Sequence, residues 1–255
     1  ESCSHFGKTP PCADALVKAG VKRVLVGTLD SNPKVSGAGL KKLRDAGIEV
    51  IEGIHQARCE SINREWLFAH RTGRPFVTLK MATSLDGLYT AADGKSQWIT
   101  GATARAQGHA LRARVDAIIT GRVTSEVDKP RFTARADTWE ATRGRVLPPP
   151  DWQGEQPEVL VLSRASTPDL KLFLESLHAR GLHDVMVEAG PTLTRSFLEA
   201  RLCDEIWLFL GPRFLGGAGA RLDSLAGGIL PGLEVSVIET QLFLEGDIWL
   251  RLRLK

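Results

Sequence analysis

The stretch Val187-Glu188-Ala189-Gly190-Pro191-Thr192-Leu193 decides the fold, because it joins a predicted strand to a predicted helix. The segment 184–188 is short, apolar and β-branched, which is typical of a buried strand. Apolar residues recur at helical spacing over 192–202. Between them, Gly190 can take a positive φ or let a ligand approach the backbone, and Pro191 suits the first position of a helix. The stretch therefore predicts a strand that turns through a glycine into a helix.

A turn of this kind can bind an anion. The first N–H groups of a helix lie at the positive end of its dipole and have no partner within the helix, so they attract groups such as phosphate. Glu188, at the carboxyl end of the strand, would face the same crevice. Many strand–glycine–helix turns are connections only, so the stretch alone leaves both interpretations open.

The composition argues against several classes of partner. A formal charge of +3, with no basic run that carries interleaved aromatic residues, argues against a nucleic acid partner. No stretch approaches the roughly 18 consecutive apolar residues of a membrane span, and no signal peptide is found at the start, so no membrane partner is expected. With 255 residues, the chain can form one large domain or two smaller ones.

The four cysteines favour a reducing, cytoplasmic location, since only Cys3 and Cys12 are close in sequence and no disulfide framework is indicated. These two residues flank a glycine- and proline-rich loop and could give two thiolates to a zinc ion. Zinc needs a third ligand, and His5 is so close in sequence that it would require an awkward chelate. Position 1 is glutamate rather than methionine, so we expect further sequence upstream.

Residues 1–72 alternate helix and strand patterns, which predicts β/α repeats around a small parallel sheet. The predicted elements are helix 13–19, strand 21–26, helix 39–46, strand 48–51 and helix 62–70. Residues 71–75 have the composition of a linker. We therefore expect a second segment to begin at about residue 73.

Strand and helix patterns continue beyond the linker. The predicted elements are strand 76–79, helix 102–114, strands 117–120 and 159–162, helix 170–179, strand 184–188, helix 192–202, and strands 205–210, 235–243 and 248–254. Thr100 is expected to cap the helix over 102–114. Arg105, His109 and Arg112 recur along that helix at near-helical spacing, a pattern that usually marks a solvated face but also occurs at ligand sites.

Polar residues near strand ends and in loops are the candidates for ligand contacts. Lys80, at the end of an apolar strand, is costly to bury unless it meets a partner or a ligand, although its ammonium could also reach solvent. Ser163 and Arg164 follow another strand and could meet the 2′-phosphate of an NADP-type cofactor, or form an ordinary polar loop. Arg131 and Arg135 lie in a loop, where a guanidinium offers a planar fork to a phosphate.

The run Cys3-Ser-His-Phe-Gly-Lys-Thr-Pro-Pro-Cys12 resembles the zinc–cysteine loop of the riboflavin-biosynthesis pyrimidine deaminases. In that family, two cysteines and an upstream histidine hold zinc, and a glutamate of the same His-x-Glu motif transfers protons. The resemblance assigns Cys3 and Cys12 as metal ligands, whereas the histidine and the glutamate have no counterpart in these 255 residues. Ser2 also stands where the family usually has proline. We therefore expect no deaminase activity from these residues.

Four groups of residues occur in order along the second segment: the stretch 79–87, the stretch 96–100, Thr124 with Asp128, Pro130 and Arg135, and the stretch 187–192. Together they resemble the reductase domain of the bifunctional riboflavin-biosynthesis deaminase–reductase. With the deaminase-like start, the resemblance covers nearly the whole chain. It implies an α/β chain in which a partial cytidine-deaminase-like β/α segment over 1–72 precedes a dihydrofolate-reductase-like mixed-sheet domain over 73–255.

The resemblance also implies a reaction and a set of contact residues. NADPH is expected to reduce the ribose of 5-amino-6-ribosylaminouracil 5′-phosphate to a ribityl chain, in an enzyme that forms a homo-oligomer. The implied cofactor contacts are Ala82, Trp98, Thr124, Asp128, Ser163, Gly190, Pro191, Thr192, Leu193, Thr194, Arg195 and Ser196. The implied substrate contacts are Ser96, Arg112, Phe132, Arg135 and Glu188, with Arg112 and Arg135 as partners of the sugar phosphate. Phe132 stands where the family commonly has leucine.

The reaction needs an acid or electrostatic assistance, because the ribose ring must open to an imine before its anomeric carbon can accept hydride. Lys80, Asp86 and Glu188 are candidates by residue type and by position, and the sequence does not rank them. Two other functions remain open at this point, since a fold does not fix a substrate. One is a dihydrofolate-reductase-like enzyme for another pterin or pyrimidine, and the other is a non-catalytic NADPH- or ligand-binding module.

Overall fold

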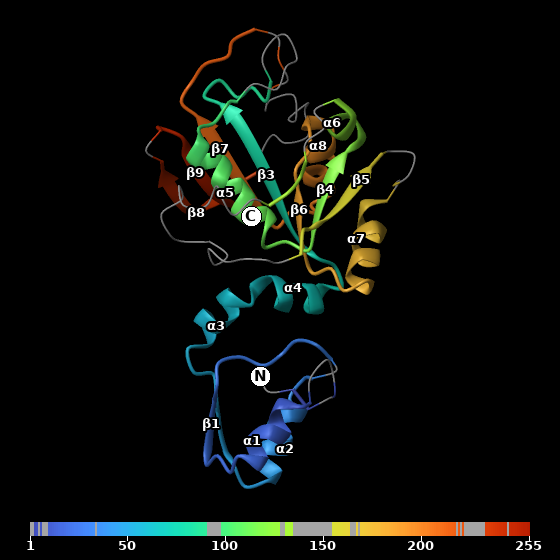
Figure 1. The fold of residues 1–255 in the computed structure, drawn as a ribbon, viewed down its shortest axis with the longest axis vertical. Coiled ribbons are helices and arrows are strands. Elements are labelled where there is room, and N and C mark those ends of the chain that lie inside the picture. Colours follow the sequence, from blue (N-terminus) through green and yellow to red (C-terminus); the bar gives the residue numbers. More distant parts are fainter. Residues whose placement is uncertain are drawn as a thin grey trace. The chain divides into compact units, whose positions relative to one another are not determined.

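Two units make up the chain in the computed structural model, Glu1–Pro75 and Phe76–Lys255, and each is described by itself (Figure 1). The structure describes residues 3–4, 6, 10–33, 35–90, 98–127, 131–134, 155–163, 167, 169–217, 219, 221, 233–243 and 245–255. Within these ranges, no helix combines the length and the apolar character that crossing a membrane requires.

The first unit is built on two parallel strands, which confirms the predicted small parallel sheet. Its elements are α1 (Cys12–Lys18), β1 (Arg23–Val26), α2 (Ala38–Asp45), β2 (Glu49–Glu52), α3 (Gln56–Ile62) and α4 (Arg64–Thr72). The core consists of Ala13, Val26, Leu40, Leu43 and Ile48, contributed by α1, α2 and the strands or their immediate ends. Side chains of α1 and α2 therefore cover the small sheet.

The single helix predicted over 62–70 is wrong in detail, because two helices meet at Asn63. Asn63 has a φ of −106°, which ends α3 just before α4 begins. None of the residues of α3 is buried, whereas α4 buries Leu67 and Ala69. Since α3 has no buried apolar face, it carries no periodic signal from which the sequence could predict it.

The second unit is organised around a mixed sheet of seven strands. Its elements are β3 (Phe76–Ser84), α5 (Ala102–Arg112), β4 (Ala117–Gly121), α6 (Arg122–Val127), β5 (Glu158–Leu162), α7 (Leu170–Ala179), β6 (Asp184–Val187), α8 (Pro191–Glu199), β7 (Glu205–Gly211), β8 (Val235–Leu242) and β9 (Ile248–Leu254). The strand order is β5-β4-β6-β3-β7-β9-β8. The first five strands in this order are parallel, and β9 runs antiparallel to both β7 and β8. This topology confirms the predicted mixed-sheet domain of α/β class.

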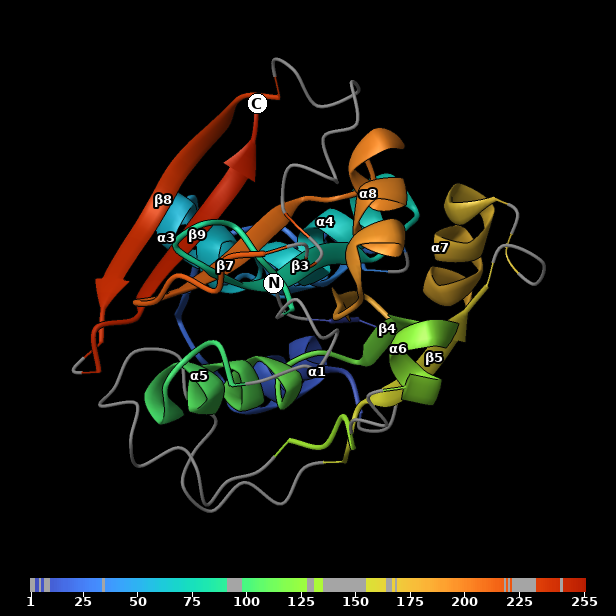
Figure 2. The same cartoon turned by 90° about the horizontal axis from the view of Figure 1, so that it is seen from above.

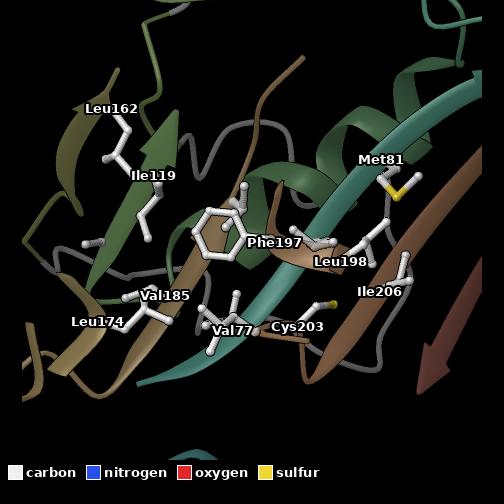
Figure 3. Close-up of a cluster of buried hydrophobic side chains, with 14 of the residues drawn as sticks. Val77, Met81, Ile119, Leu162, Leu174, Val185, Phe197, Leu198, Cys203 and Ile206 are labelled. Carbon is white, nitrogen blue, oxygen red and sulfur yellow. The ribbon is translucent and has the colours of Figure 1, made fainter. Parts of the chain in front are cut away.

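Helices cover both faces of this sheet, with α5 on one side and α7 and α8 on the other (Figure 2). Successive side chains of a strand point to opposite faces. Val77, Leu79 and Met81 of β3 accordingly pack with the buried residues of α7 and α8. Figure 3 labels Val77 and Met81 in this cluster, together with Leu174 of α7 and Phe197 of α8. Lys80 and Ala82 therefore lie on the α5 face of the central strand. Because side chains alternate along β3, the side chain of Lys80 lies on the α5 side of the sheet.

The expected cap of α5 by Thr100 is wrong. The N-cap residue is Gly101, which has no side chain that could cap the helix. Instead, the N–H of Gly101 donates to Asp247 Oδ2 at 2.8 Å, and the N–H of Thr103 donates to Glu245 Oε2 at 2.9 Å. A Cβ at position 101 would lie 2.6 Å from Asp247 Oδ2, so a larger residue here would displace this carboxylate. The loop between β8 and β9 therefore supplies the cap.

Candidate functional site

Glu188 lies at the carboxyl end of β6, where the predicted strand meets the turn into α8. Its N–H donates to Ile119 O at 3.0 Å and continues the pairing with β4. Its carboxylate accepts two hydrogen bonds from Arg112, from Nε and Nη2, both at 2.9 Å. A third hydrogen bond comes from Lys80 Nζ at 3.2 Å. The site therefore joins the ends of β6 and α5 to the middle of β3.

This carboxylate is held as an anion. Burial by itself would raise the pKa of Glu188, but the charges of Lys80 and Arg112 and their hydrogen bonds lower it to about 2. The three side chains are 14% to 22% exposed, so solvent screens them only in part. At neutral pH, Glu188 is therefore ionised and has no proton to donate in this arrangement.

Lys80 has the partner that its position on an apolar strand requires. In addition to Glu188, its Nζ lies 6.0 Å from the centroid of the Phe209 ring. Gly108 of α5 faces the lysine stem, since a Cβ at position 108 would lie 3.7 Å from Lys80 Cε. The ammonium is thus held between the sheet and α5 beside the carboxylate.

Arg112 makes a further contact, which sequence reasoning missed. Its Nη1 donates to Thr133 O at 3.2 Å, and His109 Nδ1 lies 2.9 Å from the same oxygen. The guanidinium carbon is 5.8 Å from the centroid of the buried Phe132 ring. Of the predicted substrate contacts, Arg112, Phe132 and Glu188 therefore lie together. The i,i+3 spacing of His109 and Arg112 was the signal for the missed contact, but a spacing alone does not reveal an acceptor on another segment.

Asp86, the third candidate for acid chemistry, is held by a different set of donors. Its carboxylate accepts hydrogen bonds from Ser84 Oγ at 2.5 Å, from Gly216 N at 2.8 Å and from Leu215 N at 3.1 Å. The hydrogen bond from Ser84 is the main cause that lowers the pKa of Asp86 to about 2. In the part of the chain that the structure describes, no hydrogen bond or ion pair links Asp86 to Lys80. The carboxylate instead joins the turn after β3 to the segment after β7.

The turn from β6 into α8 has the strand–turn–helix form predicted from the sequence. Gly190 is extended, with φ −69° and ψ 173°, so the turn does not use a positive φ. Its N–H donates to Thr124 Oγ1 at 3.1 Å, and a Cβ at this position would lie 3.4 Å from that oxygen. The N-cap residue Gly190 has no side chain to cap α8, which begins with Pro191. The first turn of α8 thus has the geometry of an anion site.

The remaining predicted cofactor positions are spread over several elements. Pro191, Thr192 and Leu193 form the first turn of α8, whereas Thr194 Oγ1 donates to Ala189 O, Ser196 Oγ donates to Thr192 O and Arg195 pairs with Glu199. Ala82 lies on β3 facing α5, and Ser163 follows β5. Trp98 is 73% exposed, and the guanidinium of Arg105 lies 4.4 Å from its ring centroid. Ser96, Asp128 and Arg135 lie outside the described residues.

Cys3 and Cys12 lie next to each other in the first unit. The N–H of Cys12 donates to Cys3 Sγ at 3.4 Å, and a hydrogen bond with Cys3 raises the pKa of the Cys12 thiol. Among the described residues, no third histidine, cysteine or carboxylate side chain joins the two thiols, and His5 lies outside that set. Among the described residues, the pair therefore offers two thiols and no complete zinc site.

The sheet is open, and the ion pairs of Glu188 lie at the carboxyl end of β6, beside the turn into α8. This arrangement is typical of the class of α/β proteins that bind ligands at the carboxyl edge of a parallel sheet. Residues 75–239 match the model of the family described as RibD C-terminal domain, and the chain belongs to this family.

Known proteins resemble the chain over most of its length. The riboflavin biosynthesis protein RibD of Escherichia coli is 34% identical in an alignment that covers 92% of this chain and 73% of the relative. The structure of Acinetobacter baumannii RibD is 34% identical with a TM-score of 0.83, covering all of this chain and 79% of that one. A Thermotoga maritima structure, named a diaminohydroxyphosphoribosylaminopyrimidine deaminase/5-amino-6-(5-phosphoribosylamino)uracil reductase, is 27% identical with a TM-score of 0.82 and covers 100% and 78%. The predicted resemblance, and with it the prediction of an oxidoreductase of riboflavin biosynthesis, is confirmed.

Proposed function

We propose that the unit Phe76–Lys255 catalyses the NADPH-dependent reduction of the ribosyl group of 5-amino-6-(5-phosphoribosylamino)uracil to the ribityl product. The observation that carries the proposal is the cluster of Lys80, Arg112 and Glu188 in a member of the RibD C-terminal domain family. Support for the substrate comes from the name of the Thermotoga maritima relative, which includes this reductase activity.

The turn at Gly190 fits the pyrophosphate of NADPH. Among the described residues, no side-chain cap covers the N–H groups at the start of α8, and Thr124 Oγ1 accepts the hydrogen bond of the preceding Gly190 N–H. Nearby, a Cβ on Gly121 at the end of β4 would lie in ordinary van der Waals contact with the Leu193 side chain, at 3.9 Å. When bound, NADPH supplies the hydride. The chain itself supplies the site that orients this cofactor against the substrate.

Lys80 is the residue that we assign to proton transfer. Opening of the ribose ring to the imine places a proton on the ring oxygen. Asp86 and Glu188 both have a pKa of about 2 and are ionised at neutral pH, so neither has a proton to give. Lys80 is the cation among the three candidates, and its ammonium carries protons beside Glu188. We assign orientation of the ribose hydroxyls to Glu188 and a structural role to Asp86.

Arg112 can serve the substrate phosphate while it holds Glu188. A guanidinium has five N–H groups, of which Glu188 takes two and Thr133 O takes one. Two N–H groups remain, one each on Nη1 and Nη2. We propose that they share the phosphate with Arg135, which lies outside the described residues.

NADPH oxidation, followed by absorbance with and without the ribosylaminouracil phosphate, tests the proposal. Oxidation that requires this substrate supports the proposed reductase. Oxidation with dihydrofolate or another pterin instead would favour the alternative enzyme, and NADPH binding without any oxidation would favour a non-catalytic module.

Several further expectations remain predictions. We propose that residues 1–72 are part of a zinc deaminase domain, with Cys3 and Cys12 as two of its ligands, and that residues 73–255 form the reductase domain. We derive no deaminase step from these residues, because the described set of zinc ligands is incomplete. Self-association and a cytoplasmic location also stay predictions.

A further inference from the structure

The last turn of α5 binds a backbone carbonyl that the proposed reaction does not use. His109 and Arg112 are three residues apart, so both side chains leave the same face of the helix. His109 Nδ1 lies 2.9 Å from Thr133 O, and Arg112 Nη1 lies 3.2 Å from the same atom. One carbonyl oxygen therefore connects the imidazole to the guanidinium.

The chemistry of this contact fixes the position of a proton on His109. A carbonyl oxygen can only accept hydrogen bonds, so Nδ1 of His109 must carry the proton that it shares with Thr133 O. Arg112 Nη1 lies 3.5 Å from the same Nδ1, but since both nitrogens are donors there is no hydrogen bond between them. Both groups donate to the two lone pairs of one oxygen.

The segment that carries this oxygen is held from two sides. The side chain of Gln156 accepts from Ala134 N at 2.9 Å and donates to Ala134 O at 3.3 Å. Next to Thr133, the ring of Phe132 is buried although the backbone φ is +50°, a left-handed conformation that non-glycine residues rarely adopt. Such a conformation persists only where neighbouring contacts hold it. The hydrogen bonds of His109 and Gln156 are contacts of that kind.

We infer that His109 is a positioning residue, which fixes the guanidinium of Arg112 and through it the carboxylate of Glu188. The guanidinium is planar, and two of its edges are bound, one to Glu188 and one to Thr133 O. The plane of Arg112 is therefore set by the place of Thr133 O, which His109 holds. The inference rests on the proposed function, because the purpose of the arrangement is to orient Glu188 toward the ribose.

Two substitutions at this position separate a positioning role from a packing role. Asparagine can place an amide N–H close to the position of Nδ1, whereas leucine fills similar space without a donor. We expect His109→Leu to lower kcat for the ribosylaminouracil phosphate by about tenfold, because a small misplacement of a reacting group has effects of this size. NADPH affinity should stay within about twofold of the wild type, since the contacts of Gly190 and Thr124 are unchanged. His109→Asn should recover most of kcat.

The full chain is used throughout, and two outcomes contradict the inference. If His109→Leu has the kcat of the wild type, or if His109→Asn is impaired as strongly as His109→Leu, His109 does not position Arg112. A wild-type chain that never oxidises NADPH with this substrate would instead overturn the proposed function, and with it the role of His109. Activity of the wild type thus separates the two failures.

A measurement of the imidazole itself needs no activity and covers the case in which His109→Leu does not fold. The ¹⁵N chemical shifts of the histidine side chains show which nitrogen carries the proton, and the resonance lost in His109→Asn identifies His109. We expect the proton on Nδ1. A proton on Nε2 alone would exclude the hydrogen bond to Thr133 O and overturn the inference.

Discussion

Asp86 and Glu188 are acidic residues near the carboxyl ends of neighbouring parallel strands, and the pKa of each is lowered to about 2. The causes differ. The Asp86 carboxylate accepts hydrogen bonds from a hydroxyl and two backbone N–H groups, which are fixed parts of the chain connections. The Glu188 carboxylate is held by the charged ends of Lys80 and Arg112, which come from two different elements. The two carboxylates have the same pKa, but only Glu188 is held by charged side chains that can also bind a ligand. This difference distinguishes the candidate site from the structural turn at Asp86.

The largest effect is expected from removing the ammonium of Lys80, the proposed proton donor, which lies beside Glu188. Lys80→Met should lower kcat by about 10² to 10⁴, the usual contribution of a positioned general acid. The same change leaves Glu188 bound to Arg112, so NADPH affinity should not change. Steady-state NADPH oxidation and NADPH titration measure the two quantities. Lys80→Arg is the matched control, because it keeps the charge but holds its protons too tightly to donate one. Wild-type kcat in Lys80→Arg would contradict proton transfer by Lys80.

A smaller loss is expected when the carboxylate itself is neutralised. Glu188→Gln keeps the shape of the side chain but leaves Lys80 and Arg112 without their anion. We expect kcat/KM for the ribosylaminouracil phosphate to fall by about 10 to 100-fold, and the free energy of unfolding to fall by about 1–3 kcal/mol. Enzyme kinetics and urea unfolding of the same preparation measure both. A variant that loses stability alone would place Glu188 with Asp86, among the structural acids.

The pH dependence of stability separates the two acids in a further way. The folded pKa of Glu188 is about 2, below its ordinary value of 4.5, so the folded state binds this proton less readily than the unfolded state. Its stabilising contribution is therefore present above pH 4.5 and is lost as the pH falls toward 2. For Asp86, the corresponding window begins at 3.8. Urea unfolding from pH 6 to pH 2 should show a weaker pH dependence in Glu188→Gln than in the wild type. Equal slopes would contradict the ion-pair cluster.

The sequence predicts local elements better than contacts between residues that are far apart along the chain. Helix 170–179 and strand 248–254 have the predicted bounds, because apolar periodicity is a local signal. The short polar helix α6 lacks that signal and was missed. Lys80 could be predicted to need a partner, but Glu188 is 108 residues away and Arg112 is 76 residues from Glu188.

The cap of α5 was wrong for the same reason. The residues that accept from Gly101 and Thr103 are 146 and 142 residues further along the chain. A single sequence shows which groups need partners. The strand order, with β6 between β4 and β3 and β9 between β7 and β8, decides which partners they meet.

The smallest effect on catalysis is expected at Asp86, the structural acid of the comparison. Asp86→Asn removes the charge but keeps one oxygen that can accept from Ser84, Leu215 or Gly216. Since no described contact joins Asp86 to the Lys80–Glu188 cluster, kcat should stay within about twofold of the wild type. The melting temperature should fall, because the turn after β3 and the segment after β7 lose a charge-assisted connection. Thermal unfolding and NADPH oxidation on one sample measure both. If kcat falls as far as in Glu188→Gln while the melting temperature is unchanged, Asp86 belongs to the reacting groups, and the distinction between fixed neutral donors and charged side chains fails.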